Sequence, residues 1–198
     1  MVGTLTGPTA VVHGGTSLWQ QTGFHLLGLL TGALPTGAAL GALGALLGVA
    51  RLGPARAALW ALLTAAYGLH ELALVRMPHP QRSRQVPHHW RRRYAPRRVA
   101  FAYGLLLGPG FLVFVRSTAY YLAVLGVVLS GSPGLGALVF GLIALGRSAP
   151  LVASTVFQQG GGVLPQFLEG TVRADPWARL VSGWVLLALA GAALAAVL

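Results

Sequence analysis

The sequence contains no cysteine and no lysine, and its only acidic residues are Glu71, Glu169 and Asp175. The lack of cysteine excludes disulfides, thiolate metal sites and thiol redox chemistry. The lack of lysine excludes Schiff-base chemistry and the phosphate-binding P-loop. Three acids supply neither a pair of catalytic carboxylates nor a Ser–His–acid triad. We therefore expect no enzymatic activity.

Charge is scarce while apolar residues are abundant. Of the 198 residues, 9% are charged and 55% are hydrophobic, whereas a soluble domain has roughly 25% charged residues. So little charge cannot solvate the surface of a soluble domain, and the sequence predicts an integral membrane protein. The first fifty residues hold no arginine, so we expect no cleaved secretory leader at the start.

Five apolar runs approach or exceed the length of about 20 residues that a bilayer core requires. The sequence therefore predicts an all-α fold, a polytopic transmembrane helix bundle of about five spans in a single domain. An arm of mixed apolar and polar residues, 1–22, precedes the bundle, and residues 158–177 with their glycines and prolines predict a surface loop. The expected spans are about 23–50, 57–75, 99–131, 135–157 and 178–198.

The third run, 99–131, is too long for one straight crossing, since a helix of that length would measure roughly 50 Å. It contains Gly108-Pro109-Gly110, and we expect a single crossing broken there, with a short re-entrant piece as the alternative.

The first run contains Pro35, which predicts a kink. It also contains glycines at small-xxx-small spacing, which predict close helix packing. These pairs are Gly28/Gly32, Gly37/Gly41 and Gly44/Gly48.

Arginine is distributed unevenly, and the bias predicts the orientation. The loop 76–98 has no acid, so the positive-inside rule places it in the cytoplasm. Five crossings then give a cytoplasmic N-terminus and an exterior C-terminus, in what we expect to be a prokaryotic cytoplasmic membrane. Loop arginines expected to set topology or contact anionic lipids are Arg76, Arg82, Arg84, Arg91, Arg92, Arg93, Arg97 and Arg98.

The same loop holds His88-His89 and aromatic residues among its arginines. Such a mixture can bind nucleic acid, but a basic loop between two spans more often contacts lipid headgroups, so we expect no nucleic-acid partner. The loop has no acid or cysteine to complete a ligand set, so we expect no metal site.

Five ionisable residues fall inside the predicted spans: His25, His70, Glu71, Arg116 and Arg147. Charges at this depth are costly and normally face a partner or a polar cavity. One reading is a buried polar or ligand site in which Glu71 pairs with Arg116, or instead with Arg147. The other is a pair of structural arginines satisfied by helix ends and neighbouring subunits. His25 and His70 are candidate ligands of a haem-like cofactor or hydrogen-bonded packing residues, and the sequence identifies no cofactor.

Three stretches resemble the DsbD/CcdA-type cytochrome c biogenesis transmembrane family. They read YGLHELALVRMPHPQRSRQVPHHWRRR, AFAYGLLLGPGFLVFV and FGLIALGRSAPLV between Tyr67 and Val152. The resemblance implies electron transport through paired cysteines on two inverted three-helix repeats, with a cytoplasmic central loop. This chain has neither cysteine: Arg116 and Ala119 stand where the second-repeat cysteine and its proline would fall. The family's first helix is also missing, so the resemblance implies a redox-inactive relative.

Two functional hypotheses follow. The first is an accessory or assembly subunit of a larger membrane complex, respiratory or photosynthetic, whose partners are other membrane subunits and the lipid bilayer with its anionic lipids. The alternative is a small membrane transporter whose Arg116 and Arg147 line a site for an anion or metal oxyanion.

Overall fold

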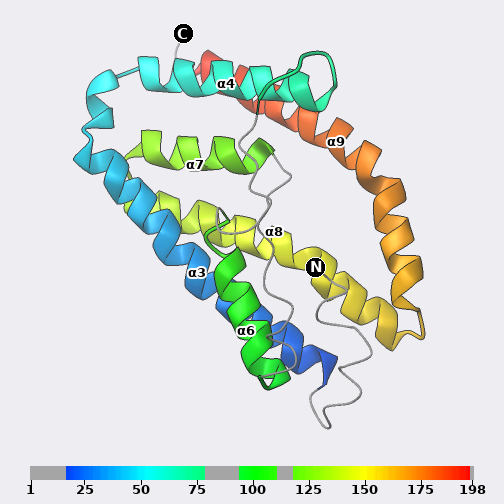
Figure 1. Cartoon of the computed structure of the whole chain (residues 1–198). Coiled ribbons are helices and arrows are strands. Elements are labelled where there is room, and N and C mark those ends of the chain that lie inside the picture. The colour runs from blue at the N-terminus through cyan, green and yellow to red at the C-terminus, as the bar shows by residue number, and fades with distance from the viewer. Residues whose placement is uncertain (1–16, 79–93, 111–117, 197–198) are drawn as a thin grey trace. The chain divides into compact units, whose positions relative to one another are not determined.

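The computed structural model describes residues 17–78, 94–110 and 118–196 (Figure 1). Within these ranges the chain forms six α-helices and one short 3-10 helix, and no strand occurs, which confirms the all-α prediction. The elements are α3 (Leu18–Leu46), η1 (Val49–Leu52), α4 (Ala55–Glu71), α6 (Pro96–Leu107), α7 (Thr118–Ser130), α8 (Pro133–Gln159) and α9 (Leu164–Ala195).

The helices divide into two compact units. The described part of the first unit consists of residues 17–36, 94–110 and 140–172. The described part of the second unit consists of residues 37–78, 118–139 and 173–196. Helices α3, α8 and α9 therefore each contribute residues to both units.

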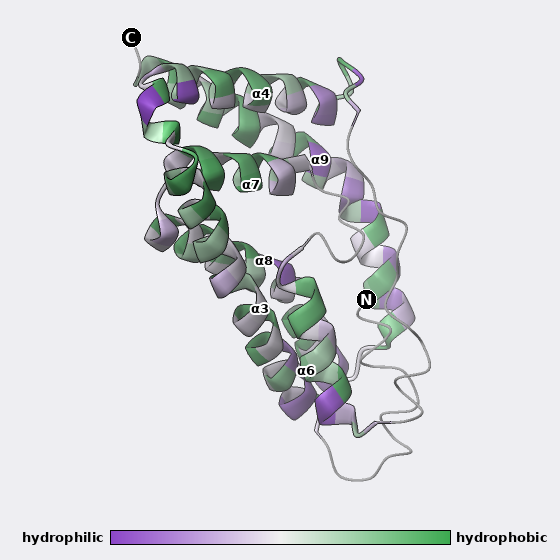
Figure 2. Cartoon of the chain, turned by 60° about the vertical axis from the view of Figure 1, so that its left-hand side comes forward, coloured by the Kyte–Doolittle hydropathy of each residue, from purple (hydrophilic) through white to green (hydrophobic). Residues whose placement is uncertain are grey.

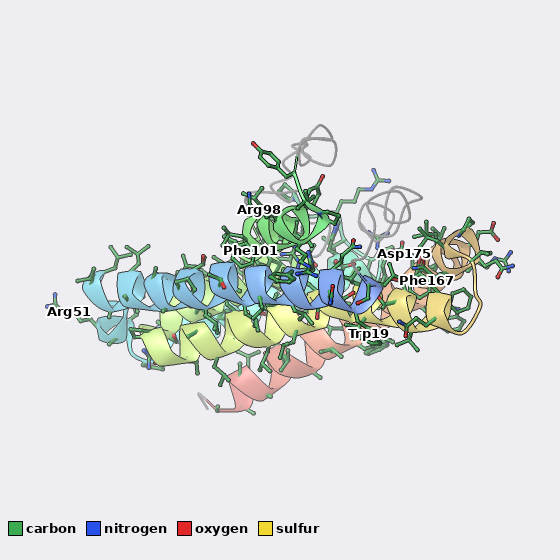
Figure 3. The ribbon with its side chains drawn as sticks, turned by 90° about the horizontal axis from the view of Figure 1, so that it is seen from below. Trp19, Arg51, Arg98, Phe101, Phe167 and Asp175 are labelled. Atoms are coloured by element: carbon green, nitrogen blue, oxygen red, sulfur yellow. The ribbon has the colours of Figure 1, made fainter. Side chains whose placement is uncertain are left out.

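In the first unit, glycines bring α3 and α6 into direct backbone contact. A Cβ atom added to Gly28 would overlap the carbonyl oxygen of Phe101, and one added to Gly104 would overlap that of His25. One turn further along, a Cβ on Gly32 would lie 2.5 Å from the Leu105 carbonyl oxygen. The close packing predicted for Gly28/Gly32 is confirmed. On the facing side, glycines at the same four-residue spacing, Gly104 in α6 and Gly108 directly after it, contact the backbone of α3. Figure 3 shows α6, with Arg98 and Phe101, lying across α3.

In the second unit, α4 and α7 lie side by side, and hydrophobic residues run along both (Figures 1 and 2). A Cβ atom on Gly44 would overlap the Val128 carbonyl oxygen, so the end of α3 also packs closely on α7. Gly48 does not continue this glycine face: its φ of 66° ends the helical run. Gly48 and Gly53, whose φ is 54°, bound η1 in the short connection to α4, because glycine adopts this backbone region without strain.

The predicted arm and the predicted loop both differ from the helix boundaries in the structure. Helix α3 begins at Leu18, so the last residues of the expected arm are helical, while residues 1–16 lie outside the described residues. The loop predicted over 158–177 is wrong, because α8 continues to Gln159 and α9 begins at Leu164. Pro165 is the second residue of α9, where no N–H is needed for the helix, and α9 continues through Pro176.

Three of the helices are long and apolar enough to cross a membrane: α3, α8 and α9. Helix α7 is apolar but shorter. Helix α6 ends at Leu107 and α7 begins at Thr118, within the run expected to be broken at Gly108-Pro109-Gly110. Residues 111–117 between them are outside the described ranges, so a count of five spans and the form of this break stay predictions.

Candidate functional site

The first unit buries polar side chains where α3 meets α8. Four polar residues are less than 5% exposed there: Gln21, Thr22, Ser154 and Thr155. Thr155 Oγ1 donates to the Leu151 carbonyl oxygen at 3.0 Å. The Thr22 and Thr155 hydroxyl oxygens are 3.0 Å apart, so Thr22 is the donor to Thr155. The two helices are thus joined by a polar contact inside an apolar segment.

His25, one turn further along α3, faces α6. Its side chain is buried, and Nδ1 lies 3.3 Å from the carbonyl oxygen of Ala100. A carbonyl oxygen can only accept, so Nδ1 carries the hydrogen and Nε2 of a neutral ring keeps the lone pair. This is the tautomer of a histidine that ligates through Nε2. A ligand role for His25 remains a prediction.

Two further hydrogen bonds tie together the ends of helices in the first unit. Trp19 Nε1 donates to Gln159 Oε1 at 2.7 Å, linking the start of α3 to the end of α8. Arg97 Nη2 donates to Gln20 Oε1 at 3.0 Å, linking the start of α6 to α3. Arg97, Arg76 and Arg98 are all exposed, and Arg97 makes this contact with Gln20. The other loop arginines, Arg82, Arg84, Arg91, Arg92 and Arg93, lie outside the described residues.

Arg147 of α8 binds the end of α6. Its Nη1 donates to the carbonyl oxygen of Leu107, the last residue of that helix, at 3.1 Å. The carbonyl groups of the last helical turn lack partners within the helix and carry the negative end of its dipole. This contact matches the reading in which a span arginine is satisfied by a helix end. Pairing of Arg147 with Glu71 stays untested, since the two belong to different units.

In the second unit, Glu71 joins three helices. Thr118 Oγ1, at the start of α7, donates to Glu71 Oε1 at 2.5 Å. Arg179 Nε of α9 lies 3.5 Å from Glu71 Oε2. The Glu71 side chain is only 7% exposed, while that of Arg179 is 52% exposed. The predicted partner Arg116 lies in 111–117, outside the described residues, so that pairing is neither supported nor excluded.

Thr118 and Arg179 were not predicted as partners of Glu71. The predicted topology gave a hint, because Glu71 lies near the end of the predicted span 57–75 and Arg179 near the start of the predicted span 178–198. Five crossings predict that both residues lie toward the cytoplasmic side. Arg179 lies 108 positions after Glu71, so sequence spacing does not reveal the contact.

His70 and its neighbours shape the exit from α4. The Met77 N–H donates to His70 Nδ1 at 3.1 Å, and Tyr67 Oη donates to the Pro78 carbonyl oxygen at 2.8 Å. The Tyr67 and His70 rings meet edge to face with centroids 6.4 Å apart. In this arrangement His70 anchors the residues that leave the helix. No group of three or more His, Asp or Glu residues that could hold a metal occurs among the described residues.

Comparison with known proteins finds relatives named methylamine utilization protein MauF. The relative from Methylophilus methylotrophus is 33% identical over 187 residues, which cover 91% of this chain and 62% of the relative. That from Methylobacillus flagellatus is 31% identical over 180 residues, 89% of this chain and 61% of the relative. That from Paracoccus versutus is 37% identical over 131 residues, 66% and 48% respectively. The chain thus spans less than two thirds of each relative. No family model and no solved structure matches the chain.

These similarities correct the earlier expectations. The relatives belong to a different family from DsbD/CcdA, so that resemblance, and with it the electron-transport reading, is wrong. They are named for methylamine utilization, so the respiratory or photosynthetic subunit and the transporter alternative are wrong as well. The three quoted stretches misled because apolar helices around an arginine-rich loop are a pattern that unrelated membrane proteins share.

Proposed function

We propose that this chain is an integral membrane protein that serves methylamine utilization as a non-catalytic accessory protein. The observation that supports this function is the similarity to the Methylophilus methylotrophus relative, which extends over 91% of the chain. The membrane setting rests on the long apolar helices α3, α8 and α9.

The polar groups support an accessory role rather than catalysis. Three of the polar contacts described above join one helix to another: Thr22 to Thr155, His25 to Ala100, and Glu71 to Thr118. A general acid or base needs its titratable group to face a space where a substrate atom can lie. Here Glu71, the only acid in the predicted spans, accepts a hydrogen bond from Thr118 and pairs with Arg179.

We further propose five crossings, with α6 and α7 forming one crossing together. Helix α4 has 17 residues and measures about 25 Å, close to the hydrocarbon thickness. Helices α6 and α7 have 12 and 13 residues, and each alone is too short to cross. The arginine distribution supports a cytoplasmic N-terminus, with Arg51 and Arg56 on the outer side.

The function is tested by complementation in Methylophilus methylotrophus from which the gene for its own relative has been removed. We expect the chain to restore growth on methylamine and to leave growth on another carbon source unchanged. The matched control is the Methylophilus relative shortened to the 187 residues that align with this chain. If the shortened relative restores growth and this chain, present in the membrane by immunoblot, does not, the proposed function is wrong.

A further inference from the structure

The second unit contains an open apolar groove with one arginine on its wall. The groove has a volume of about 440 Å³ and lies between the first turns of α4, the part of α7 from Ala123 to Ser130, and the start of α8. Its lining is apolar or small apart from Arg56, Ser130 and the indole nitrogen of Trp60. The lining residues are Arg56, Ala57, Trp60, Ala123, Gly126, Val127, Leu129, Ser130, Leu135 and Val139.

Trp60 and Gly126 give the groove its shape. Trp60 Nε1 donates to the Leu122 carbonyl oxygen at 3.0 Å, which fixes the indole ring against α7. A Cβ atom on Gly126 would lie 2.7 Å from Trp60 Nε1, so only glycine at this position lets the ring lie there. This hydrogen bond satisfies the one polar atom of the indole ring, and the apolar surface of the ring lines the groove.

Arg56 gives the groove its charge. It lies in the first turn of α4, two residues after Pro54, and is half-buried. No carboxylate lines the groove. Glu71 lies at the opposite end of α4, about 22 Å away along the helix axis. The groove therefore combines a positive charge near one helix end with an apolar wall along the helices.

We propose that this groove binds an anionic phospholipid, with the phosphate at Arg56 and an acyl chain along Trp60, Gly126 and Val139. Charge complementarity supports this occupant, because a guanidinium binds phosphate oxygens through paired hydrogen bonds. The apolar wall supports it too, since a free inorganic anion would leave that wall unused. In the topology proposed above, the groove lies beside the α3–α4 connection at the membrane surface, where a headgroup and an acyl chain meet.

The inference is tested by fluorescence quenching of Trp60 in bilayers. Trp19, Trp90, Trp177 and Trp184 are replaced by Phe, and the chain is reconstituted in phosphatidylcholine containing either brominated phosphatidylglycerol or brominated phosphatidylcholine. Bromine quenches indole fluorescence only at contact distance. Quenching of Trp60 therefore shows which brominated lipid occupies the groove. We expect phosphatidylglycerol to be preferred about fivefold, the ratio expected of one arginine near an anionic headgroup.

Matched arginine variants distinguish phospholipid binding at Arg56 from a general attraction of anionic lipid to the positive charges of the chain. Arg56→Gln must abolish the preference while both lipids still quench Trp60. Arg51→Gln, which removes an exposed charge of the same connection that does not line the groove, must retain it. Ala123→Phe must reduce quenching by both lipids because it fills the groove. Equal quenching by the two lipids, or a preference that survives Arg56→Gln, overturns the proposal.

A second measurement covers the case in which the Phe substitutions disturb folding. Native mass spectrometry of the otherwise unsubstituted chain, released from mixed-lipid micelles, must show retained phosphatidylglycerol, and Arg56→Gln must lose it while Arg51→Gln keeps it. A chain that retains no lipid overturns the proposal. A Trp60 that is shielded from both brominated lipids in a cross-linked dimer shows that a second copy of the chain covers the groove, and this result overturns it as well.

Discussion

Thr118 and Glu71 are 47 residues apart, and the threonine hydroxyl donates to the glutamate carboxylate at 2.5 Å. The contact joins the first residue of α7 to the last residue of α4. Because the Glu71 side chain is only 7% exposed, this hydroxyl replaces much of the hydration that the carboxylate gives up on burial. The half-exposed guanidinium of Arg179 lies next to the other carboxylate oxygen, Glu71 Oε2, and partly neutralises its charge.

The first prediction concerns this carboxylate. Glu71→Gln keeps an acceptor for Thr118 and loses only the pairing with half-exposed Arg179, so we expect a loss of about 1 kcal/mol in unfolding free energy. Glu71→Leu removes the acceptor as well and costs about 1–3 kcal/mol. Thermal unfolding in detergent measures both, with Glu169→Gln on the exposed face of α9 as the neutral control. If Glu71→Gln costs 3–5 kcal/mol while Arg179→Gln costs nothing, another arginine such as Arg116 is the partner.

The second prediction concerns the glycine contact between α3 and α6. Gly28→Ala forces its Cβ against the Phe101 carbonyl oxygen, and we expect a destabilisation of about 1–3 kcal/mol. Gly23→Ala, on the same helix with nothing within 4 Å of its Cβ position, is the matched control and is expected to be neutral or slightly stabilising. Melting temperatures in the same detergent compare the two. Equal effects at Gly23 and Gly28 would show that the helices do not approach closely there.

The third prediction concerns the buried threonines. Thr22 donates to Thr155, and each hydroxyl can also bond within its own helix, so we expect the coupling between Thr22→Val and Thr155→Val to be only about 0.6 kcal/mol. A double-mutant cycle by thermal or denaturant unfolding measures it. A coupling above about 2 kcal/mol would indicate a larger polar network around these residues.

The fourth prediction concerns orientation. Because the chain has no cysteine, single cysteines report on sidedness directly. Arg51→Cys is expected to react with an impermeant maleimide on intact cells, and Ser83→Cys only after lysis. Labelling of Ser83→Cys before lysis would reverse the proposed topology.

Much of the fold was predictable because it depends on local properties. Apolar runs of sufficient length must form helices in a bilayer, where every backbone group needs an internal partner. The small-xxx-small spacing at Gly28 and Gly32 identified a close-packing face, since glycine exposes the backbone whatever its neighbour is. The prediction of a loop over 158–177 was wrong because a proline in the first turn of a helix favours the start of that helix. Pro165 occupies such a position in α9.

The sequence alone therefore determined that the chain forms long apolar helices suited to a membrane, and that it has no chemistry that needs a thiol or a lysine amine. The tertiary structure decided which residues meet. Glu71 contacts Thr118 and Arg179, and Arg147 contacts the Leu107 carbonyl oxygen. The groove exists only because α4, α7 and α8 bring Arg56, Trp60 and Val139 together. Such pairings depend on how helices distant in the chain pack. Because a guanidinium can donate to any nearby carbonyl or carboxylate oxygen, spacing in the sequence cannot select the partner.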